Sequence, residues 1–235
     1  MVSRPRYIMS RPGVYAMHSD PAMRAVLFDL DNTLVRFIDA QRAACEAVIE
    51  LVGAGSADDL FACFLRPVHG FESPAHIDDY LVSLGCDADP AATAARYEAA
   101  KLEALRPYDG VPDVLGALGD AGIPLGVVSD ADAAHAAARL ERCGLSGCFD
   151  IVVTPDVTGE RKPAATNFLY ALDRLGAAPV SAAMVGDSLR RDIEPANLLG
   201  LLSIHAAYGD WNPGYDCIPD HRLDEIATLA PILLG

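Results

Sequence analysis

The sequence is poor in basic residues and lacks long apolar runs. Lysine and arginine together number 18 against 33 acidic residues, so the formal net charge is −15. This sign argues against nucleic acid or an anionic membrane as a partner, because both attract positive charge. No stretch reaches the roughly 18 apolar residues that a membrane-spanning helix needs. A small anionic substrate stays compatible with this composition where local basic groups and a metal ion reverse the field.

Paired cysteines and a secretion signal are also missing. The six cysteines are scattered and form no C-x-x-C pair, which argues against a zinc site and against a secreted disulfide framework. Residues 1–22 carry three arginines but no apolar segment of the signal-peptide kind. We therefore expect a cytoplasmic protein with reduced thiols, a monomer or homodimer, in which residues 1–22 form a disordered extension.

Short apolar runs are present, and in the second half of the chain they alternate with helical segments. This alternation predicts an α/β fold, with a Rossmann-like, doubly wound parallel sheet built from right-handed crossovers. The predicted strands are 25–28, 125–128, 151–153, 182–185 and 201–204. The predicted helices of this core are 112–121, 131–143, 164–175, 189–199 and 222–233, and Pro195 should kink or shorten the fourth of them.

Between the first two strands lies a segment with helical periodicity and almost no strand-like runs. It predicts four helices near 38–52, 57–66, 75–84 and 90–105. Ser56 and Asp89 are candidate N-caps, and Gly85 lies just past a helix end. We therefore expect an all-helical cap at 37–106, of the four-helix bundle type, inserted into a core formed by 23–36 and 107–235.

Polar residues follow the predicted strands where each one ends. Asp29 and Asp31 follow the first strand, Ser129 and Asp130 the second, and Asp187 the fourth. Ligands of doubly wound sheets bind at the carboxyl ends of the strands, so these side chains form a candidate site. Two carboxylates two residues apart can share a face of an extended chain, and their repulsion requires a cation or a proton nearby. Any single Asp in such a position is more often a turn former or a helix cap.

Taken together, these residues resemble the haloacid dehalogenase superfamily, chiefly its phosphatases. Four motifs of that superfamily occur in the family's order, and the resemblance covers residues 24 to about 205. A helical cap between the first two motifs is also a family arrangement. The matching segments are Asp29-Leu30-Asp31-Asn32-Thr33, Val127-Val128-Ser129-Asp130, Arg161-Lys162-Pro163, and Val185-Gly186-Asp187-Ser188 with Asp192.

The resemblance implies a Mg²⁺-dependent phosphatase acting on a small phosphorylated metabolite. Asp29 is the expected nucleophile, which becomes an aspartyl-phosphate, and Asp31 the expected proton carrier. The expected Mg²⁺ ligands are Asp29, Asp187 and the backbone carbonyl of Asp31. Phosphate binding is expected from Ser129, Lys162, Thr33 and the backbone amides of Asn32 and Asp130. Ser188 and Asp192 are expected to lie around this site, and each is also a candidate for a purely structural role at the start of a helix.

Other activities stay open within the resemblance. A sugar phosphomutase has a similar core and differs in how its cap controls the access of water. Dehalogenases of the superfamily lack the second acid of the first motif, so Asp31 argues against that chemistry. A phosphonatase needs a cap lysine, and the only lysine of the insert, Lys101, lies late in the last predicted cap helix. A non-catalytic binding protein has no need of two mutually repelling acids.

Overall fold

The computed structural model describes residues 23–212 and 214–235, so the predicted extension at 1–22 lies outside the described residues. Its centre is a six-stranded parallel sheet with the strand order β3-β2-β1-β4-β5-β6. The predicted α/β, Rossmann-like fold class is confirmed. The strands are β1 (Ala25–Phe28), β2 (Leu125–Val128), β3 (Ile151–Val153), β4 (Ala182–Gly186), β5 (Leu202–Ala206) and β6 (His221–Leu223).

Both faces of the sheet are covered by helices, which explains why its central strands read as continuous apolar runs. Val26 and Phe28 of β1 pack on one face, together with the first group of helices given below. Ala25 and Leu27 pack on the other face, with the second group. The first group is α5 (Val111–Asp120), α6 (Ala133–Arg142) and α10 (Leu229–Leu234), and the second is α8 (Ala165–Leu175) and α9 (Glu194–Leu199).

The C-terminal segment differs from the sequence prediction. In place of a helix at 222–233, residues 221–223 form strand β6, and α10 begins only at Leu229. Asp220 explains the difference, because its carboxylate accepts hydrogen bonds from the amide and the hydroxyl of Ser203 at 2.9 and 3.0 Å. These contacts dock the chain beside β5 and make residues 221–223 the next strand of the sheet.

The segment after β4 contains the proline whose effect was predicted. Residues Leu189–Ile193 form a π-helical turn, and the α-helix α9 begins only at Glu194, with Pro195 in its first turn. Proline is tolerated there because the first amides of a helix lack intrahelical acceptors. The predicted helix 189–199 is thus divided into a π-helical turn and the shorter α9, and the division falls between Ile193 and Glu194, just before Pro195. A short helix that the sequence did not indicate, α7 (Pro155–Thr158), follows β3.

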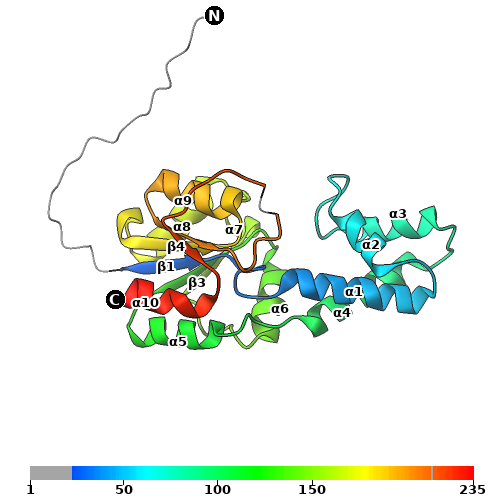
Figure 1. Cartoon of the computed structure of the whole chain (residues 1–235), viewed down its shortest axis with the longest axis horizontal. Helices are drawn as coiled ribbons and strands as arrows, with labels where there is room; N and C mark the ends of the chain where they lie inside the picture. The colour runs from blue at the N-terminus through cyan, green and yellow to red at the C-terminus, as the bar shows by residue number, and fades with distance from the viewer. Residues whose placement is uncertain (1–22, 213) are drawn as a thin grey trace, which may run out of the picture.

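Four helices between β1 and α5 form a separate unit, which we call the cap (residues 37–104). They are α1 (Phe37–Val52), α2 (Ala57–Phe64), α3 (Ala75–Ser83) and α4 (Pro90–Ala104), and they share their own apolar core. Figure 1 shows α1 and α4 leading away from the sheet, with α2 and α3 farther from it. Ser56 and Asp89 cap α2 and α4 as predicted. The predicted domain boundaries at 36/37 and 106/107 stay a prediction.

The cap and the sheet are joined by two chain segments that run side by side. The amide of Arg36 donates to the carbonyl of Arg106 at 2.9 Å, and the amide of Tyr108 donates to the carbonyl of Leu34 at 3.0 Å. Both crossings lie directly beyond the carboxyl end of β1, so the cap is attached next to the point where ligands of this fold bind. Within the described residues, no helix has both the length and the apolar character needed to cross a membrane.

Candidate active site

The site lies where the strand order reverses, between the ends of β1 and β4. Phe28 of β1 pairs with Val185 of β4, and the amide of Asp29 donates to the Val185 carbonyl at 2.9 Å. The two acids that follow these strands are thereby brought together. Thr33 connects them, because its hydroxyl donates to Asp29 Oδ2 at 3.0 Å and accepts from the amide of Asp187 at 2.9 Å. In a doubly wound sheet this reversal point is the expected position of the ligand.

A lysine and a third acid complete the cluster. Lys162 Nζ forms ion pairs with Asp29 Oδ1 and, at 2.7 Å, with Asp192 Oδ1. Asp192 Oδ2 accepts a hydrogen bond from the amide of Ser188 at 3.0 Å. Gly186 is required here, because a Cβ on it would lie 2.4 Å from Asp192 Cγ. Asp192 thus lies inside the site, and Ser188 caps the following turn through the amide of Arg191, as predicted for its structural role.

The three carboxylates carry more negative charge than Lys162, their direct partner, and the nearby Arg191 offset. Oxygen atoms of Asp29, Asp187 and Asp192 lie within 4.8 Å of one another, and all three residues are buried. Burial, together with the charges of Asp29 and Asp192, raises the pKa of Asp187 well above its usual value. Asp187 Oδ1 is buried and has no hydrogen-bond partner. An orphaned carboxylate oxygen among three acids fits a divalent cation with oxygen ligands, which for Mg²⁺ are a few carboxylates plus waters and phosphate oxygens.

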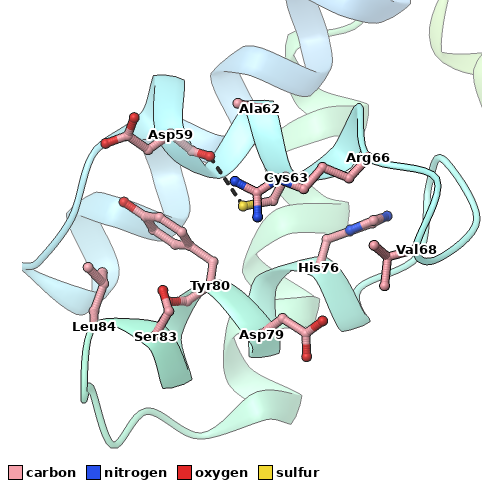
Figure 2. A pocket seen from close by; sticks show the side chains of 10 residues that line it. All are labelled: Asp59, Ala62, Cys63, Arg66, Val68, His76, Asp79, Tyr80, Ser83 and Leu84. Atoms are coloured by element: carbon pink, nitrogen blue, oxygen red, sulfur yellow. Dashed lines mark hydrogen bonds between the residues drawn. The ribbon is translucent and has the colours of Figure 1, made fainter.

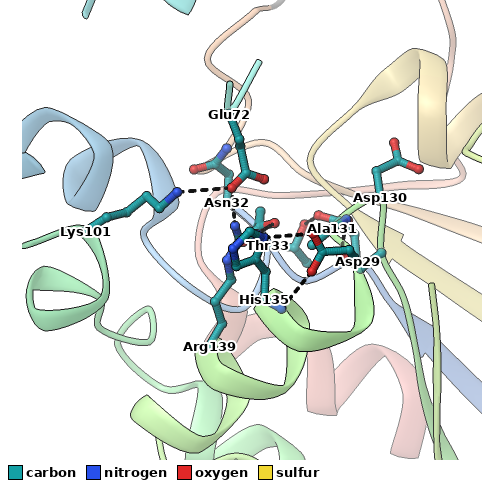
Figure 3. Close-up of polar contacts among 12 residues, drawn as sticks. Asp29, Asn32, Thr33, Glu72, Lys101, Asp130, Ala131, His135 and Arg139 are labelled. Atoms are coloured by element: carbon teal, nitrogen blue, oxygen red, sulfur yellow. Dashed lines mark hydrogen bonds and ion pairs between the residues drawn. The ribbon is translucent and has the colours of Figure 1, made fainter. Parts of the chain in front are cut away.

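Asp31 is linked to the cap through an arginine of the core. Its Oδ2 forms an ion pair with Arg139 of α6, and the same guanidinium forms a second ion pair with Glu72 of the cap. Lys101 of α4 contacts Glu72 Oε2 at 3.3 Å (Figure 3). Burial raises the pKa of Asp31 to about 6, although the Arg139 charge lowers it. The other oxygen, Asp31 Oδ1, is buried and has no partner.

The predicted phosphate-binding residues of the second and third motifs lie beside the cluster. Ser129 is buried, and its Oγ accepts from the amide of Ala131 at 3.1 Å, which leaves the hydroxyl proton free to donate. Asp130 Oδ1 accepts from the backbone amide of Lys162 at 2.8 Å. The carboxylate of Asp130 thus holds the Lys162 loop in place, a role that the motif alone did not suggest.

Two groups that are predicted to bind phosphate, the Asn32 amide and the Thr33 hydroxyl, make hydrogen bonds within the protein. The amide of Asn32 donates to the carbonyl of Val35 at 2.8 Å, and the side chain of Asn32 accepts from the amide of Ile38 at 3.0 Å. Both groups are occupied because residues 31–35 close a tight turn, in which Asn32 has a φ of 64°. The hydroxyl of Thr33 connects Asp29 with Asp187 and is fully buried. Asn32 and Thr33 thus shape the site through these hydrogen bonds, and their contacts with phosphate stay a prediction.

Several residues around the site were not found from the sequence. His205 of β5 lies 3.0 Å from the Asp187 carbonyl through Nε2, and this nitrogen carries the proton because a carbonyl only accepts. Tyr208 donates its hydroxyl to the Thr33 carbonyl at 2.8 Å. Arg139 was missed although a signal exists. It shares a helix face with the apolar residues Ala136 and Leu140, and arginine is almost never fully buried without an acidic partner.

Two cavities lie outside this cluster of acids. One of about 300 Å³ is inside the cap and is lined by residues that include Arg66, His76 and Tyr80 (Figure 2). The other, of about 290 Å³, lies between α4 and α6, and Lys101 and Arg139 are among its lining residues. Neither Asp29 nor Asp187 lines either cavity, so the strand ends, and not the cavities, define the candidate site.

Comparisons with known proteins identify the family of this chain. A family model described as haloacid dehalogenase-like hydrolase matches residues 23–200. A glyceraldehyde 3-phosphate phosphatase of Methanopyrus kandleri is 32% identical over 226 residues, which cover 90% of this chain and 97% of that protein. A phosphoglycolate phosphatase of Chromobacterium violaceum is 30% identical over 203 residues, which cover 80% of this chain and 86% of that protein.

Solved structures share the same architecture. The HAD hydrolase YfnB from Bacillus subtilis superposes with a TM-score of 0.74 at 23% identity, over 91% of this chain and all of that chain. A HAD phosphatase from Thermococcus onnurineus gives a TM-score of 0.64 at 27% identity, over 91% of this chain and 99% of that chain. Because the family model covers most of the chain, and the two named relatives are matched over 97% and 86% of their lengths, this protein belongs to the haloacid dehalogenase-like hydrolases, in their phosphatase branch.

Proposed function

We propose that the protein is a Mg²⁺-dependent phosphatase that hydrolyses a small-molecule phosphate monoester through an aspartyl-phosphate on Asp29. The observation that supports this most directly is the buried set of Asp29, Asp187 and Asp192 around Lys162, with one Asp187 oxygen left unpaired. Phosphoryl transfer needs a nucleophile in line with the leaving group and concentrated positive charge around the transferred oxygens. This cluster offers the nucleophile and the Lys162 ammonium at the end of β1, and a divalent cation held by its acids would supply the remaining positive charge.

Asp29 is proposed as the nucleophile because two neighbours fix its orientation. Lys162 contacts Oδ1, and the Thr33 hydroxyl donates to Oδ2, so the carboxylate cannot turn freely. The same Lys162 charge offsets negative charge on an incoming phosphate. Burial lowers the pKa of the Lys162 ammonium, but the charges of Asp192 and Asp29 outweigh burial, and the net pKa is raised. Lys162 therefore stays protonated in any neutral buffer.

Asp31 is proposed to move the protons of the reaction. One of its oxygens is held by Arg139, and the other is buried without a partner, which leaves an oxygen free to meet the leaving group. Protonated, Asp31 donates to the departing oxygen, and as a carboxylate it then takes a proton from the attacking water. Such general acid and base assistance typically contributes about 10²- to 10⁴-fold.

The remaining contacts are proposed from residues at the ends of β2 and β4. The Ser129 hydroxyl and the Asp130 amide donate to phosphate oxygens, as the predicted cradle requires. The carboxylates of Asp29 and Asp187, with the Asp31 carbonyl, would hold Mg²⁺, which supplies positive charge that offsets the phosphate oxygens. Asp192 would lie beside the ion, because its two oxygens already contact Lys162 and the Ser188 amide. The structure of the relative YfnB is described as bound to magnesium, which supports the choice of ion.

The substrate is proposed to be a small phosphorylated metabolite in the cytoplasm. Relatives are named as phosphatases of glyceraldehyde 3-phosphate, phosphoglycolate and N-acetylmuramic acid 6-phosphate, so these three compounds head the panel to be tested. The net charge of −15 argues against nucleic acid as a partner. Whether the enzyme acts as a monomer or a homodimer is left open.

The test is release of inorganic phosphate from this panel and from an aryl phosphate, with and without Mg²⁺. We expect Mg²⁺-dependent turnover that Asp29→Asn abolishes, and mass spectrometry of the quenched wild-type reaction should locate the phosphoryl group on Asp29. Asp173→Asn, which neutralises an exposed acid of α8, is the matched control and should keep full activity. A phosphoryl group on any other residue, or no turnover with any member of the panel, would refute the assignment.

A further inference from the structure

A continuous series of ion pairs leads from the acid Asp31 into the cap. It runs from Asp31 to Arg139 of α6, from Arg139 to Glu72, and from Glu72 to Lys101 of α4. We call these four residues the ion chain; Figure 3 shows Glu72 between Lys101 and Arg139. Asp31 and Arg139 belong to the core, and Glu72 and Lys101 belong to the cap. The ion chain therefore crosses the boundary between the core and the cap.

The two cations of the ion chain, Arg139 and Lys101, are more deeply buried than Glu72. The side chains of Arg139 and Lys101 are 4% and 6% exposed, whereas that of Glu72 is 28% exposed. The guanidinium of Arg139 lies 4.3 Å from the centre of the Phe37 ring, and the ammonium of Lys101 lies 4.9 Å from that of Tyr97. Aromatic faces stabilise such cations. Glu72 lies instead on the segment between α2 and α3, outside any helix.

The same cap segment contacts the core at a second point next to the active site. The ring of Phe71 stacks on that of Trp211, with centroids 5.5 Å apart and planes 15° from parallel. Trp211 lies two residues after Gly209, and Gly209 packs directly on the backbone of Asn32. Two adjacent cap residues thus touch the core on groups that border the turn at 31–33. Moving this segment away would remove Glu72 from Arg139.

We propose that Arg139 is a positioning residue for Asp31 and that Glu72 completes this arrangement when the cap segment covers the site. Arg139 binds Asp31 Oδ2 through Nη1 and Glu72 through Nη2, so the planar guanidinium is fixed at both ends and on the Phe37 face. With Oδ2 held, Asp31 Oδ1 is directed toward the leaving group. Closure of the cap then determines when Asp31 can deliver its proton.

The test compares two aryl esters of similar size, and it rests on the proposed function. Phenol, with a pKa of about 10 like that of tyrosine, is a poor leaving group that needs the proton of Asp31. The more acidic 4-nitrophenol leaves without it. We expect Glu72→Gln to lower kcat/KM for phenyl phosphate about 10- to 100-fold and to leave kcat/KM for 4-nitrophenyl phosphate within about 2-fold, because kcat/KM reports only the steps up to departure of the phenol.

A second readout comes from the hydrolysis of the phosphoenzyme. Asp31 must also take a proton from water in that step, so Glu72→Gln should lower kcat and KM together for 4-nitrophenyl phosphate. Release of 4-nitrophenol should then begin with a burst. Arg139→Lys keeps the charge but lacks the two-pronged geometry, and it should show the same pattern. Turnover of 4-nitrophenyl phosphate by either variant shows that the variant is folded.

Glu98→Gln is the matched control. Glu98 also pairs with Lys101, at 2.9 Å, but makes no ion pair with Arg139, so its variant should keep the wild-type ratio of the two kcat/KM values. A wild-type protein inactive with Mg²⁺ on both esters and on every metabolite of the panel would overturn the proposed function itself. The positioning role is refuted if the wild type is active and Glu72→Gln lowers both kcat/KM values equally or changes neither. Glu72 would then only help to hold the cap segment against the core.

Discussion

Adding a single carbon at Gly209, as in Gly209→Ala, should disturb the turn at residues 31–33 beside the candidate site. It lies in the segment after β5, and a Cβ built on it would be 1.7 Å from the carbonyl oxygen of Asn32 and 2.7 Å from the carbonyl carbon. Both atoms are backbone, so no flexible side chain can move aside. The turn at 31–33 carries Asp31 on one side and Thr33 on the other, and Thr33 connects Asp29 with Asp187.

The size of the effect follows from the overlap. Cβ atoms essentially never approach closer than 3.0 Å, so Gly209→Ala forces a displacement of at least 3.0 − 1.7 = 1.3 Å. Overpacking of this kind typically costs about 1–3 kcal/mol, which for a chain of this length lowers Tm by about 2–12 °C. A misplacement of about 1 Å at a reacting group can lower the rate about 100-fold. We expect both effects in one variant.

The assay pairs calorimetry with phosphate release in Mg²⁺. Gly116→Ala serves as the control, because Gly116 lies within α5 and a Cβ there meets nothing within 4 Å. Alanine is favoured over glycine inside a helix by about 0.5–1 kcal/mol, so this variant should keep its activity and gain about 1–4 °C in Tm. Wild-type Tm and kcat/KM in Gly209→Ala would show that the close approach to Asn32 does not exist.

Three further outcomes follow from the buried charges. Lys162→Met leaves Asp29 and Asp192 without their cation, which should cost about 3–5 kcal/mol and lower Tm by about 6–20 °C in a thermal scan without Mg²⁺. Mg²⁺ at about 100 times its dissociation constant should stabilise the wild type by about 2.7 kcal/mol; an equal gain in Asp187→Asn would exclude Asp187 as a ligand. Burial lowers the pKa of His76 below its ordinary 6.5, so the unfolded chain binds more protons below that pH. The contribution of His76 to stability should therefore fall as the pH drops from 7 toward 5, so the wild type should lose stability relative to His76→Gln over this range, and a difference that stays constant would rule out this origin.

The sheet could be predicted from the sequence wherever a strand is buried on both faces. The runs at 25–28, 125–128 and 182–185 are continuous and apolar, and the residues that follow them therefore marked the site. Strand β6 has no such run. Its three residues include the exposed His221 and Arg222, and it exists because Asp220 binds Ser203 on the neighbouring strand. Pairing set by a contact between distant residues leaves no local pattern.

The sequence indicated which motif residues lie near one another, but it did not indicate the hydrogen bonds that their backbone and side chains make. Lys162 and Asp192 lie in the cluster with Asp29, as their places after the strands suggested. The amide of Asn32 and the hydroxyl of Thr33 are instead occupied by hydrogen bonds within the protein. A sequence motif indicates which residues lie near the active site. Only the backbone course of the turn decides whether a donor faces the ligand or its own chain.

The buried position of Arg139 could have been predicted from the sequence, but its two acidic partners could not. Its position three residues after Ala136 and one before Leu140 places it on the buried face of α6, and a buried guanidinium requires acids beside it. The demand for acidic partners was therefore predictable. Their identity was not, because Asp31 is 108 residues away and Glu72 is 67 residues away along the chain. With 33 acids to choose from, only the folded chain shows that one partner is the proposed proton carrier and the other belongs to the cap.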